Sequence, residues 1–263
     1  MTWRVVWHDG QEGSSAVLAD KDAAVKFAED KKDSLKFVGV VMEEVVMVPM
    51  VFIVGADKGG TGKSTVARAI LRRLPGARAV DTDRTLSRFY PSALVLDPSK
   101  VDDQIRLFEQ MPEVTLVDSG AGQLSSLLRS MRELGLLADV DRGTMDLRVI
   151  HVVGPDTSSM EEVVPVGAQL GERARHVIVK NHIDPGTQYF DFDQDRVRGY
   201  LGGDVQVVDF PHLEARVAEA VQVSGQPFEV FEKDEAHHLI LRRRLAYWLS
   251  LVDAELDGAG VVG

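Results

Sequence analysis

Cysteine is absent from the 263 residues of the chain. Its absence excludes disulfide bonds, thiolate metal ligands and a cysteine nucleophile, and it suits a reducing compartment. Long apolar runs are also missing, since no segment approaches the roughly 20 residues that a membrane-spanning helix needs. The first residues, MTWRVVWHDGQ, lack the basic region and apolar run of a secretory signal peptide. We therefore expect a cytoplasmic protein.

The chain has fewer positive than negative side chains. It contains 30 Lys and Arg residues and 41 Asp and Glu residues, which give a net charge of −11. This excess of negative charge disfavours DNA as a partner, unless a local basic patch binds it. Hydrophobic residues make up 44% of the chain, the usual share for a globular protein with a real core.

Strands and helices alternate from Met50 onward. MVFIVGA is a continuous apolar run, typical of a strand buried on both faces of a parallel sheet. STVARAILRRL follows shortly after it and has the apolar spacing of a helix with one buried face. Further strand candidates are ARAVDTD, VTLVDSG, LRVIHVVG, RHVIVKNH and VQVVDF. The pattern predicts an α/β fold with a doubly wound, mostly parallel sheet over residues 49–263.

Residues 1–48 form a separate pattern of strand, helix and strand, in the segments TWRVVWHD, DKDAAVKFAEDKKD and LKFVGVVMEEVVMV. A βαβ-like unit of this size holds no large core of its own. We interpret it as a small N-terminal appendage and a candidate partner-binding part.

GGTGKST lies where a phosphate-binding loop (P-loop) is expected, after a buried strand and at the start of a helix. Glycines let backbone N–H groups close around a phosphate, and the helix N-terminus adds the positive end of its dipole. Lys63 is suited to neutralise the β- and γ-phosphates of ATP, and the Ser64 hydroxyl is suited to bind Mg²⁺. The nucleotide-binding residues predicted from this loop are Gly59, Gly60, Thr61, Gly62, Lys63, Ser64 and Thr65.

Two neighbouring residues set the loop apart from the common pattern GxxxxGK[ST]. Asp57 stands where the first glycine would be. A carboxylate beside a triphosphate is unfavourable unless it points away or pairs with a cation, such as Lys58. Lys58 is itself a second lysine that an ordinary loop of this kind does not need.

KGGTGKST resembles the variant loop of the ParA/MinD family of ATPases, whose usual form is KGGxGK[ST]. In that family the first lysine reaches the phosphates held by the opposite subunit. The resemblance therefore implies that Lys58 makes ATP binding and homodimerisation a single event. A simple ion pair between Lys58 and Asp57 is the alternative.

Further segments resemble the same family in the same order along the chain. VDTDR resembles its DxD motif, which implies that Asp83 orients the attacking water. LVDSGAG resembles its DSPAG segment, with Gly120 in place of the proline, which implies that Asp118 holds Mg²⁺ through a water. VIVKNH and VVDFPHLEARVAEAV resemble its base-binding segments, which implies that Asn181 reads the adenine edge and that Pro211 lies in the loop passing the base.

Other side-chain groups are assigned to simpler roles. His151 lies in an apolar strand and is expected to be a hydrogen-bonded core residue, and the seven histidines show no zinc-like spacing. The aromatic residues of DPGTQYFDFDQD suggest a lid or a partner-contact loop. The last helix, AHHLILRRRLAYWLSLVDAELD, has an apolar stripe that suits packing on the sheet. Membrane contact through this helix is the alternative, and the acidic residues at its end disfavour it.

The phosphate loop predicts an ATP-binding protein, and the resemblance implies a slow, Mg²⁺-dependent ATPase that converts ATP and water to ADP and phosphate. The resemblance implies a switch that dimerises on ATP, responds to an activating protein partner, and positions or partitions a cargo. Lys58, Lys63 and Asp83 are the predicted catalytic residues. Two alternatives stay open: a metabolic P-loop enzyme such as an ATP-dependent ligase or kinase, and a nucleotide-binding module without turnover.

Overall fold

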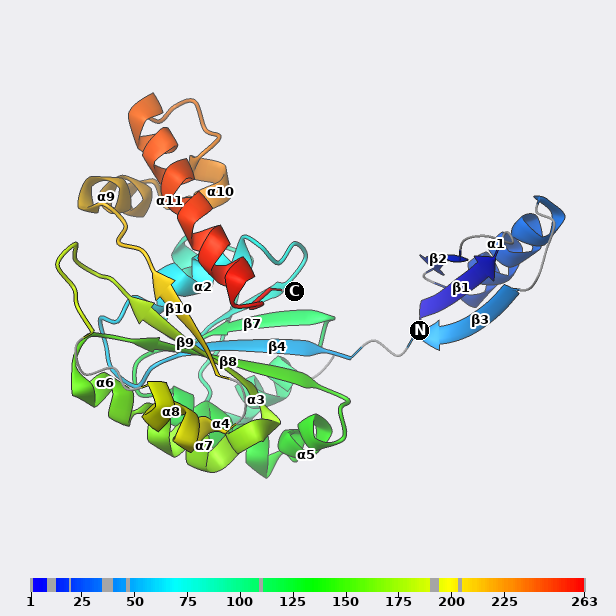
Figure 1. The fold of residues 1–263 in the computed structure, drawn as a ribbon, viewed down its shortest axis with the longest axis horizontal. Helices are drawn as coiled ribbons and strands as arrows, with labels where there is room; N and C mark the ends of the chain where they lie inside the picture. Colours follow the sequence, from blue (N-terminus) through cyan, green and yellow to red (C-terminus); the bar gives the residue numbers. More distant parts are fainter. Residues whose placement is uncertain are drawn as a thin grey trace. The chain divides into compact units, whose positions relative to one another are not determined.

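The computed structural model describes residues 2–8, 13–18, 20–34, 40–45, 48–108, 111–189, 194–202 and 205–262. The chain divides into two compact units, Met1–Val48 and Pro49–Gly263. Figure 1 shows the helices and strands of both units.

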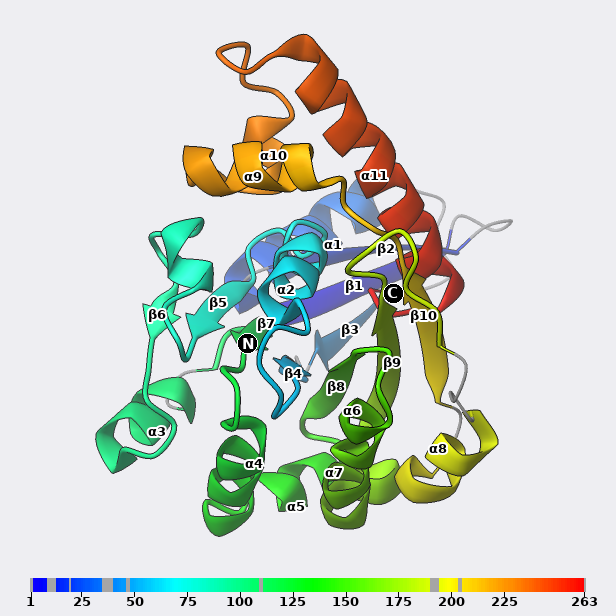
Figure 2. The same cartoon turned by 90° about the vertical axis from the view of Figure 1, so that its left-hand side faces the viewer.

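The larger unit contains a seven-stranded sheet in the order β10-β9-β8-β4-β7-β5-β6, and all of its neighbouring strands are parallel. Figure 2 shows β4 in the middle, between β7 and β8. The strands are β4 (Met50–Gly55), β5 (Arg78–Asp81), β6 (Leu94–Val95), β7 (Val114–Asp118), β8 (Asp146–Val153), β9 (Arg175–Asn181) and β10 (Gln206–Phe210). The predicted doubly wound, parallel α/β fold is therefore confirmed. Its strand order reverses at β4, and in such sheets ligands bind beyond the carboxyl ends of the strands at that point.

Helices cover both faces of this sheet (Figure 1). One face carries α2 (Lys63–Leu71), the short η1 (Leu86–Arg88), α9 (Ala215–Ser224), α10 (Phe228–Phe231) and α11 (Leu239–Gly258). The other face carries α3 (Val101–Phe108), α4 (Leu124–Glu133), α5 (Leu136–Asp141), α6 (Thr157–Glu161), α7 (Val163–Leu170), η2 (Gly171–Arg173) and α8 (Gln194–Leu201). Alternate residues of β4 enter the two cores, since Phe52 packs on the first face and Ile53 on the second. Burial on both faces explains why β4 is apolar throughout.

Helix α11 packs on the sheet, as one of the two interpretations of the sequence predicted. Its buried residues are Leu245, Trp248, Leu249, Val252 and Leu256. The indole N–H of Trp248 donates a hydrogen bond to the carbonyl oxygen of Pro211 at 2.9 Å. Within the described ranges, no helix combines the length and the apolar character needed to cross a bilayer.

Two histidines form a buried pair between β8 and β9. His151 Nε2 lies 2.9 Å from His176 Nδ1, and His176 Nε2 lies 2.9 Å from the Gly171 carbonyl oxygen. A carbonyl only accepts, so His176 carries its proton on Nε2 and accepts from His151 at Nδ1. Burial lowers the pKa of both rings, so both stay neutral. The expected core role of His151 is confirmed.

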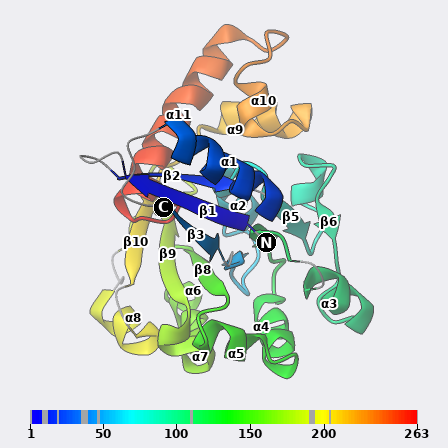
Figure 3. The same cartoon turned by 90° about the vertical axis from the view of Figure 1, so that its right-hand side faces the viewer.

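The smaller unit contains a three-stranded antiparallel sheet in the order β2-β1-β3. Its elements are β1 (Thr2–His8), β2 (Gly13–Leu18), α1 (Lys21–Ser34) and β3 (Val40–Val45). Figure 3 shows α1 lying over the strands, where Ala24 and Ala28 pack against Val5. The expected strand, helix and strand are present, with β1 and β3 antiparallel and not parallel as in a βαβ unit, and β2 is an additional strand. GSSAVL was not predicted as a strand because its serines and glycine carry little β-propensity, and its pairing with β1 decides its conformation.

Candidate functional site

The loop between β4 and α2 has the backbone of a phosphate-binding turn. Gly60 and Gly62 adopt left-handed conformations, with φ of 78° and 84°, which residues with a Cβ atom rarely adopt. Gly62 precedes the helix, and its carbonyl oxygen accepts the N–H groups of Thr65 and Val66. No side chain caps this helix in the described part of the chain. The N–H groups of Lys63 and Ser64, at the start of the helix, are therefore available to an anion.

Lys63 lies inside this loop with only 7% of its surface exposed. Its ammonium group donates a hydrogen bond to the Lys58 carbonyl oxygen at 2.7 Å. Burial lowers the pKa of Lys63, and the nearby carboxylates of Asp118 and Asp83 oppose that shift. The side chain is thus a partly desolvated cation beside acidic groups, a position suited to meeting phosphate oxygens.

Asp57 points away from the loop, toward the start of α4. Its carboxylate accepts a hydrogen bond from the Ser125 hydroxyl at 2.9 Å, and its carbonyl oxygen accepts the Gly122 N–H at 2.9 Å. This contact accounts for the departure at position 57, because the carboxylate is hydrogen-bonded to a residue outside the loop. The alternative pairing of Lys58 with Asp57 is wrong, because Lys58 pairs elsewhere.

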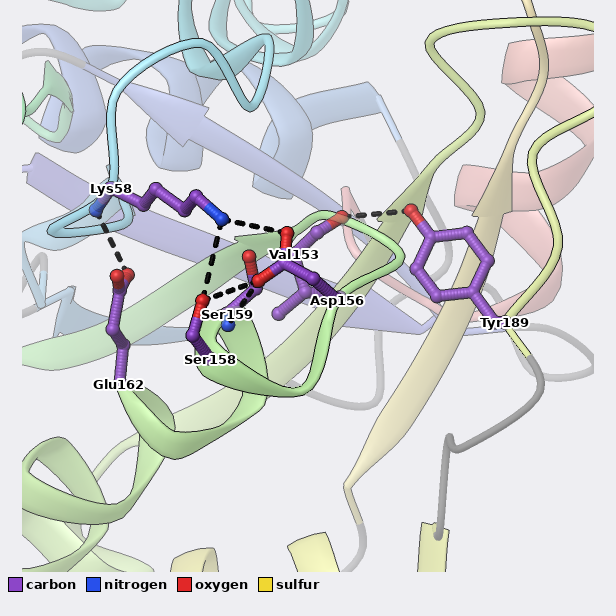
Figure 4. Close-up of polar contacts among 7 residues, drawn as sticks. All are labelled: Lys58, Val153, Asp156, Ser158, Ser159, Glu162 and Tyr189. Atoms are coloured by element: carbon purple, nitrogen blue, oxygen red, sulfur yellow. Dashed lines mark hydrogen bonds and ion pairs between the residues drawn. The ribbon is translucent and has the colours of Figure 1, made fainter.

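Lys58 contacts the segment that follows β8 (Figure 4). Its ammonium group lies 2.7 Å from an Asp156 carboxylate oxygen and 3.3 Å from the Ser158 hydroxyl. Its backbone N–H donates to the Glu162 carboxylate at 2.9 Å. These contacts were not predicted from the sequence, and they join residues about 100 positions apart along the chain.

Three carboxylates gather at the ends of neighbouring strands. Asp81 on β5 is level with Asp118 on β7, which in turn is level with Val54 on β4. Oxygen atoms of Asp81, Asp83 and Asp118 all lie within 4.8 Å of one another. The register of the sheet therefore places the predicted Asp83 and Asp118 together, directly beside the phosphate loop.

Asp118 has the environment of a ligand for a hard cation. It is 1% exposed, and neither of its oxygens has a hydrogen-bond partner among the described residues. Burial raises the pKa of Asp118 to about 7, while the side chains of Ser64 and Lys63 act in the opposite direction. A buried carboxylate with free lone pairs, near a serine hydroxyl, fits Mg²⁺ held by Ser64 and, through a water, by Asp118.

Asp81 shapes the loop that carries Asp83. One oxygen of Asp81 accepts the N–H groups of Asp83 (3.0 Å) and Arg84 (2.8 Å), and the other accepts the Ser87 N–H (2.6 Å). Asp83 itself is exposed and accepts the Thr85 N–H at 3.0 Å. The role of Asp81 was not predicted from the sequence. The signal was present, because an aspartate at a strand end often folds the following turn through its side chain.

Gly120 allows the segments that follow β5 and β7 to lie close together. A Cβ atom at this position would lie 2.9 Å from the Asp83 Cβ atom, closer than real contacts allow. The Gly120 N–H donates to the Thr82 hydroxyl (2.7 Å), which itself donates to the Asp118 carbonyl oxygen (3.2 Å). The glycine that replaces proline in the DSPAG-like segment thus keeps Asp83 close to Asp118.

The two residues assigned to the base lie on neighbouring strands. Asn181 ends β9, and its side-chain amide donates to the Thr61 carbonyl oxygen at 2.6 Å. Pro211 directly follows β10, next to β9 in the sheet. The structure brings Asn181 to the phosphate loop, and the adenine-binding roles of Asn181 and Pro211 stay predictions.

The aromatic segment after β9 is only partly described. The Tyr189 hydroxyl lies 2.9 Å from the Val153 carbonyl oxygen and 2.8 Å from that of Asn181, so it connects the ends of β8 and β9 (Figure 4). Phe190 and Phe192, which the sequence suggested for a lid or partner contact, lie outside the described residues.

Comparison with known proteins finds similarity among solved structures alone. No protein-family model matches the sequence, and no curated protein matches it. The septum site-determining protein MinD from Pyrococcus horikoshii OT3, complexed with Mg-ADP, is 18% identical, with a TM-score of 0.45 over 82% of this chain and 98% of that one. The MinD cell division protein of Aquifex aeolicus is 17% identical, with a TM-score of 0.43 over 77% of this chain and 97% of that one. Both proteins belong to the family that the loop motif resembles.

Proposed function

We propose that the protein is a Mg²⁺-dependent ATPase of the ParA/MinD type, which dimerises on ATP and positions or partitions a cargo in the cytoplasm. The observation that carries this proposal is the meeting of Lys63 and the buried Asp118 beside a loop with two left-handed glycines. A cation for phosphates and an unpaired carboxylate for a metal are the two charges that phosphoryl transfer requires.

ATP binding exchanges one contact of Lys63 for another. The ammonium group leaves the Lys58 carbonyl oxygen, its present acceptor, and neutralises the β- and γ-phosphates. The loop N–H groups and the start of α2 surround the β-phosphate. Because the loop already has this backbone, binding requires little reorganisation of the chain.

Mg²⁺ would be held by the Ser64 hydroxyl and by Asp118, and it would neutralise charge on the phosphates during hydrolysis. Asp83 is exposed and lies on a turn that Asp81 fixes. It orients the attacking water in line with the bond to be cleaved, and the products are ADP and phosphate. Positioning and charge account for most of catalysis in this reaction class.

In this proposal, Lys58 couples ATP binding to dimerisation. Its side chain is 41% exposed and lies against Asp156. Supplied to the nucleotide of a second subunit, it acts as a cation given in trans, and it makes the dimer depend on bound ATP. An activating protein partner would act on this dimer, and the unit of residues 1–48 is a candidate for contacting the partner or the cargo.

Sedimentation velocity tests the proposal. The wild type should be monomeric with ADP, and the Asp83→Ala variant, which retains ATP, should be dimeric with ATP and Mg²⁺. Lys58→Ala should bind ATP but remain a monomer. If the wild type and Asp83→Ala both stay monomeric with ATP bound, the switch is wrong and a single-subunit P-loop enzyme replaces it.

A further inference from the structure

Helix α2 carries a buried arginine, Arg68, whose charged group is in contact with two aromatic rings. We propose that Arg68 is a positioning residue, which fixes the segment that carries Asp83 through the ring of Phe89 and thereby sustains ATP turnover. This inference rests on the proposed function, and it adds a residue that lies outside the phosphate loop and the group of three carboxylates.

The guanidinium group of Arg68 packs against Phe89 and Phe228. Its Cζ atom lies 3.5 Å from the centre of the Phe89 ring and 4.0 Å from the centre of the Phe228 ring. The residue is 5% exposed, and its Nε and Nη2 atoms have no hydrogen-bond partner among the described residues. Burial lowers the pKa of Arg68 to about 10, so the group stays charged near neutral pH.

The charge makes this contact specific. A cation is attracted to the face of an aromatic ring, and the attraction is strongest where water is excluded. If either ring moved away, the buried guanidinium group would lose a favourable contact that no acceptor in the described part of the chain replaces. An apolar side chain would not incur this cost. Arg68 therefore favours a single arrangement of the Phe89 and Phe228 rings.

Phe89 lies at the end of the segment that carries Asp83. The segment begins at Asp81, whose carboxylate accepts the N–H groups of Asp83 and Ser87. It continues through the short helix η1, and Phe89 directly follows that helix. Asp81 thus holds the beginning of the segment and Arg68 holds its end. Because Asp83 is exposed and lies between these two contacts, both restrict its position.

The same arginine connects this segment to α10. Phe228 is the first residue of α10, and the Tyr90 hydroxyl donates a hydrogen bond at 3.3 Å to the carboxylate of Glu229, the next residue. Arg68 itself lies on α2, the helix that begins at the phosphate loop. The contacts of Arg68 therefore join the phosphate-loop helix, the Asp83 segment and α10 in one cluster.

Hydrogen exchange of the nucleotide-free protein tests the contact itself. Arg68→Met keeps an unbranched side chain but removes the charge. Peptides covering residues 82–90 should exchange roughly 2- to 30-fold faster in this variant, the range expected for the loss of a cation–π attraction. Arg148→Met is the matched control, because Arg148 is also buried but pairs with Asp146 at the amino end of β8. It should leave the exchange of residues 82–90 unchanged.

Steady-state hydrolysis with saturating ATP and Mg²⁺ tests the role in turnover. Arg68→Met should reduce kcat by roughly 10- to 100-fold, because Asp83 is no longer held where it orients the water. The affinity for ATP should stay within about twofold, since this orientation matters only on the way to the transition state. Arg68→Lys, which keeps a cation beside the rings, should restore part of kcat.

Stability separates positioning from a general structural role. Arg68→Met should leave the urea denaturation midpoint unchanged or raise it, because methionine removes a buried charge that has no hydrogen-bonded partner. Arg148→Met should do the reverse, lowering the midpoint while kcat stays near that of the wild type. Phe89→Leu, which removes one ring, should also reduce kcat, and its effect should not multiply with that of Arg68→Met.

Wild-type kcat in Arg68→Met, wild-type exchange of residues 82–90, or a fall in kcat explained by a lowered denaturation midpoint would each overturn the positioning role, and the proposed ATPase would stand. If the wild type itself hydrolyses no ATP, the proposed function fails. The role of Arg68 in turnover then fails with it, even if exchange of the segment responds to the substitution.

Discussion

The side-chain amide of Asn181 lies 2.6 Å from the carbonyl oxygen of Thr61, and this hydrogen bond ties the end of β9 to the phosphate loop. The same amide occupies the space where a side chain at position 62 would be, because a Cβ atom there would lie 2.1 Å from the Asn181 nitrogen. The shape of the loop thus depends on a strand 120 residues further along the chain.

Gly62→Ala should therefore destabilise the protein more than Gly60→Ala. Both glycines have positive φ, and a side chain in that conformation costs about 1–2 kcal/mol. A Cβ atom at Gly60 meets nothing within 4 Å, whereas at Gly62 it displaces Asn181 and breaks its hydrogen bond. We expect an additional loss of about 1–3 kcal/mol in the free energy of unfolding for Gly62→Ala, measured by chemical denaturation. Equal losses in the two variants would show that Asn181 does not support the loop.

Lys63→Ala should abolish tight ATP binding. The substitution removes the cation that faces the phosphates in a partly desolvated site, a loss of about 2–5 kcal/mol, or at least roughly 30-fold in affinity. Isothermal titration calorimetry with ATP and Mg²⁺ measures the change, and Lys233→Ala, at an exposed position of the same unit, is the control. An unchanged affinity would refute the assignment of the loop.

Asp83→Ala and Asp118→Ala should separate catalysis from metal binding. Asp83→Ala should bind ATP normally and lose turnover by roughly 100-fold or more, because orienting the water matters only on the way to the transition state. Asp118→Ala should instead lose the Mg²⁺ dependence of ATP binding. Binding and phosphate release are measured for both variants with and without Mg²⁺. The reverse pattern would mean that the two carboxylates have exchanged roles.

Asp118 should make the nucleotide-free, metal-free protein less stable as the pH rises. Its pKa in the folded protein is about 7, above the ordinary value of 3.8, so the folded state binds the proton more tightly than the unfolded state does. The contribution of Asp118 to the free energy of unfolding should therefore fall between about pH 4 and pH 7 and then level off, whereas the lowered pKa values of His151 and His176 contribute in the opposite direction below about pH 6.5. Asp118→Asn should remove this dependence and stabilise the protein by roughly 2–4 kcal/mol at pH 8, with little effect at pH 4. Urea denaturation at several pH values checks this, and parallel pH profiles for variant and wild type would contradict it.

Those parts of the site that depend on local pattern are predictable from the sequence. The phosphate loop, Asp83 and Asp118 each follow an apolar strand, and parallel strands bring such ends to one edge of the sheet. The contact of Lys58 with Asp156 was not predictable in this way, because it spans 98 residues and requires β8 to lie beside β4. The extra strand β2 was missed for a similar reason. Its own residues do not favour a strand, and pairing with β1 stabilises that conformation.

The hydrogen-bonded pair of His151 and His176 constrains how this sequence can diverge. An apolar residue in place of either histidine leaves the other with an unsatisfied buried nitrogen, at a cost of about 1–3 kcal/mol. Replacing both at once by apolar residues of similar shape removes the donor and the acceptor of this pair together, and the cost that remains is the lost hydrogen bond from His176 to the Gly171 carbonyl oxygen. Positions 151 and 176 are therefore expected to covary among relatives of this chain, and a relative that keeps one histidine should carry a different hydrogen-bonding side chain at the other position.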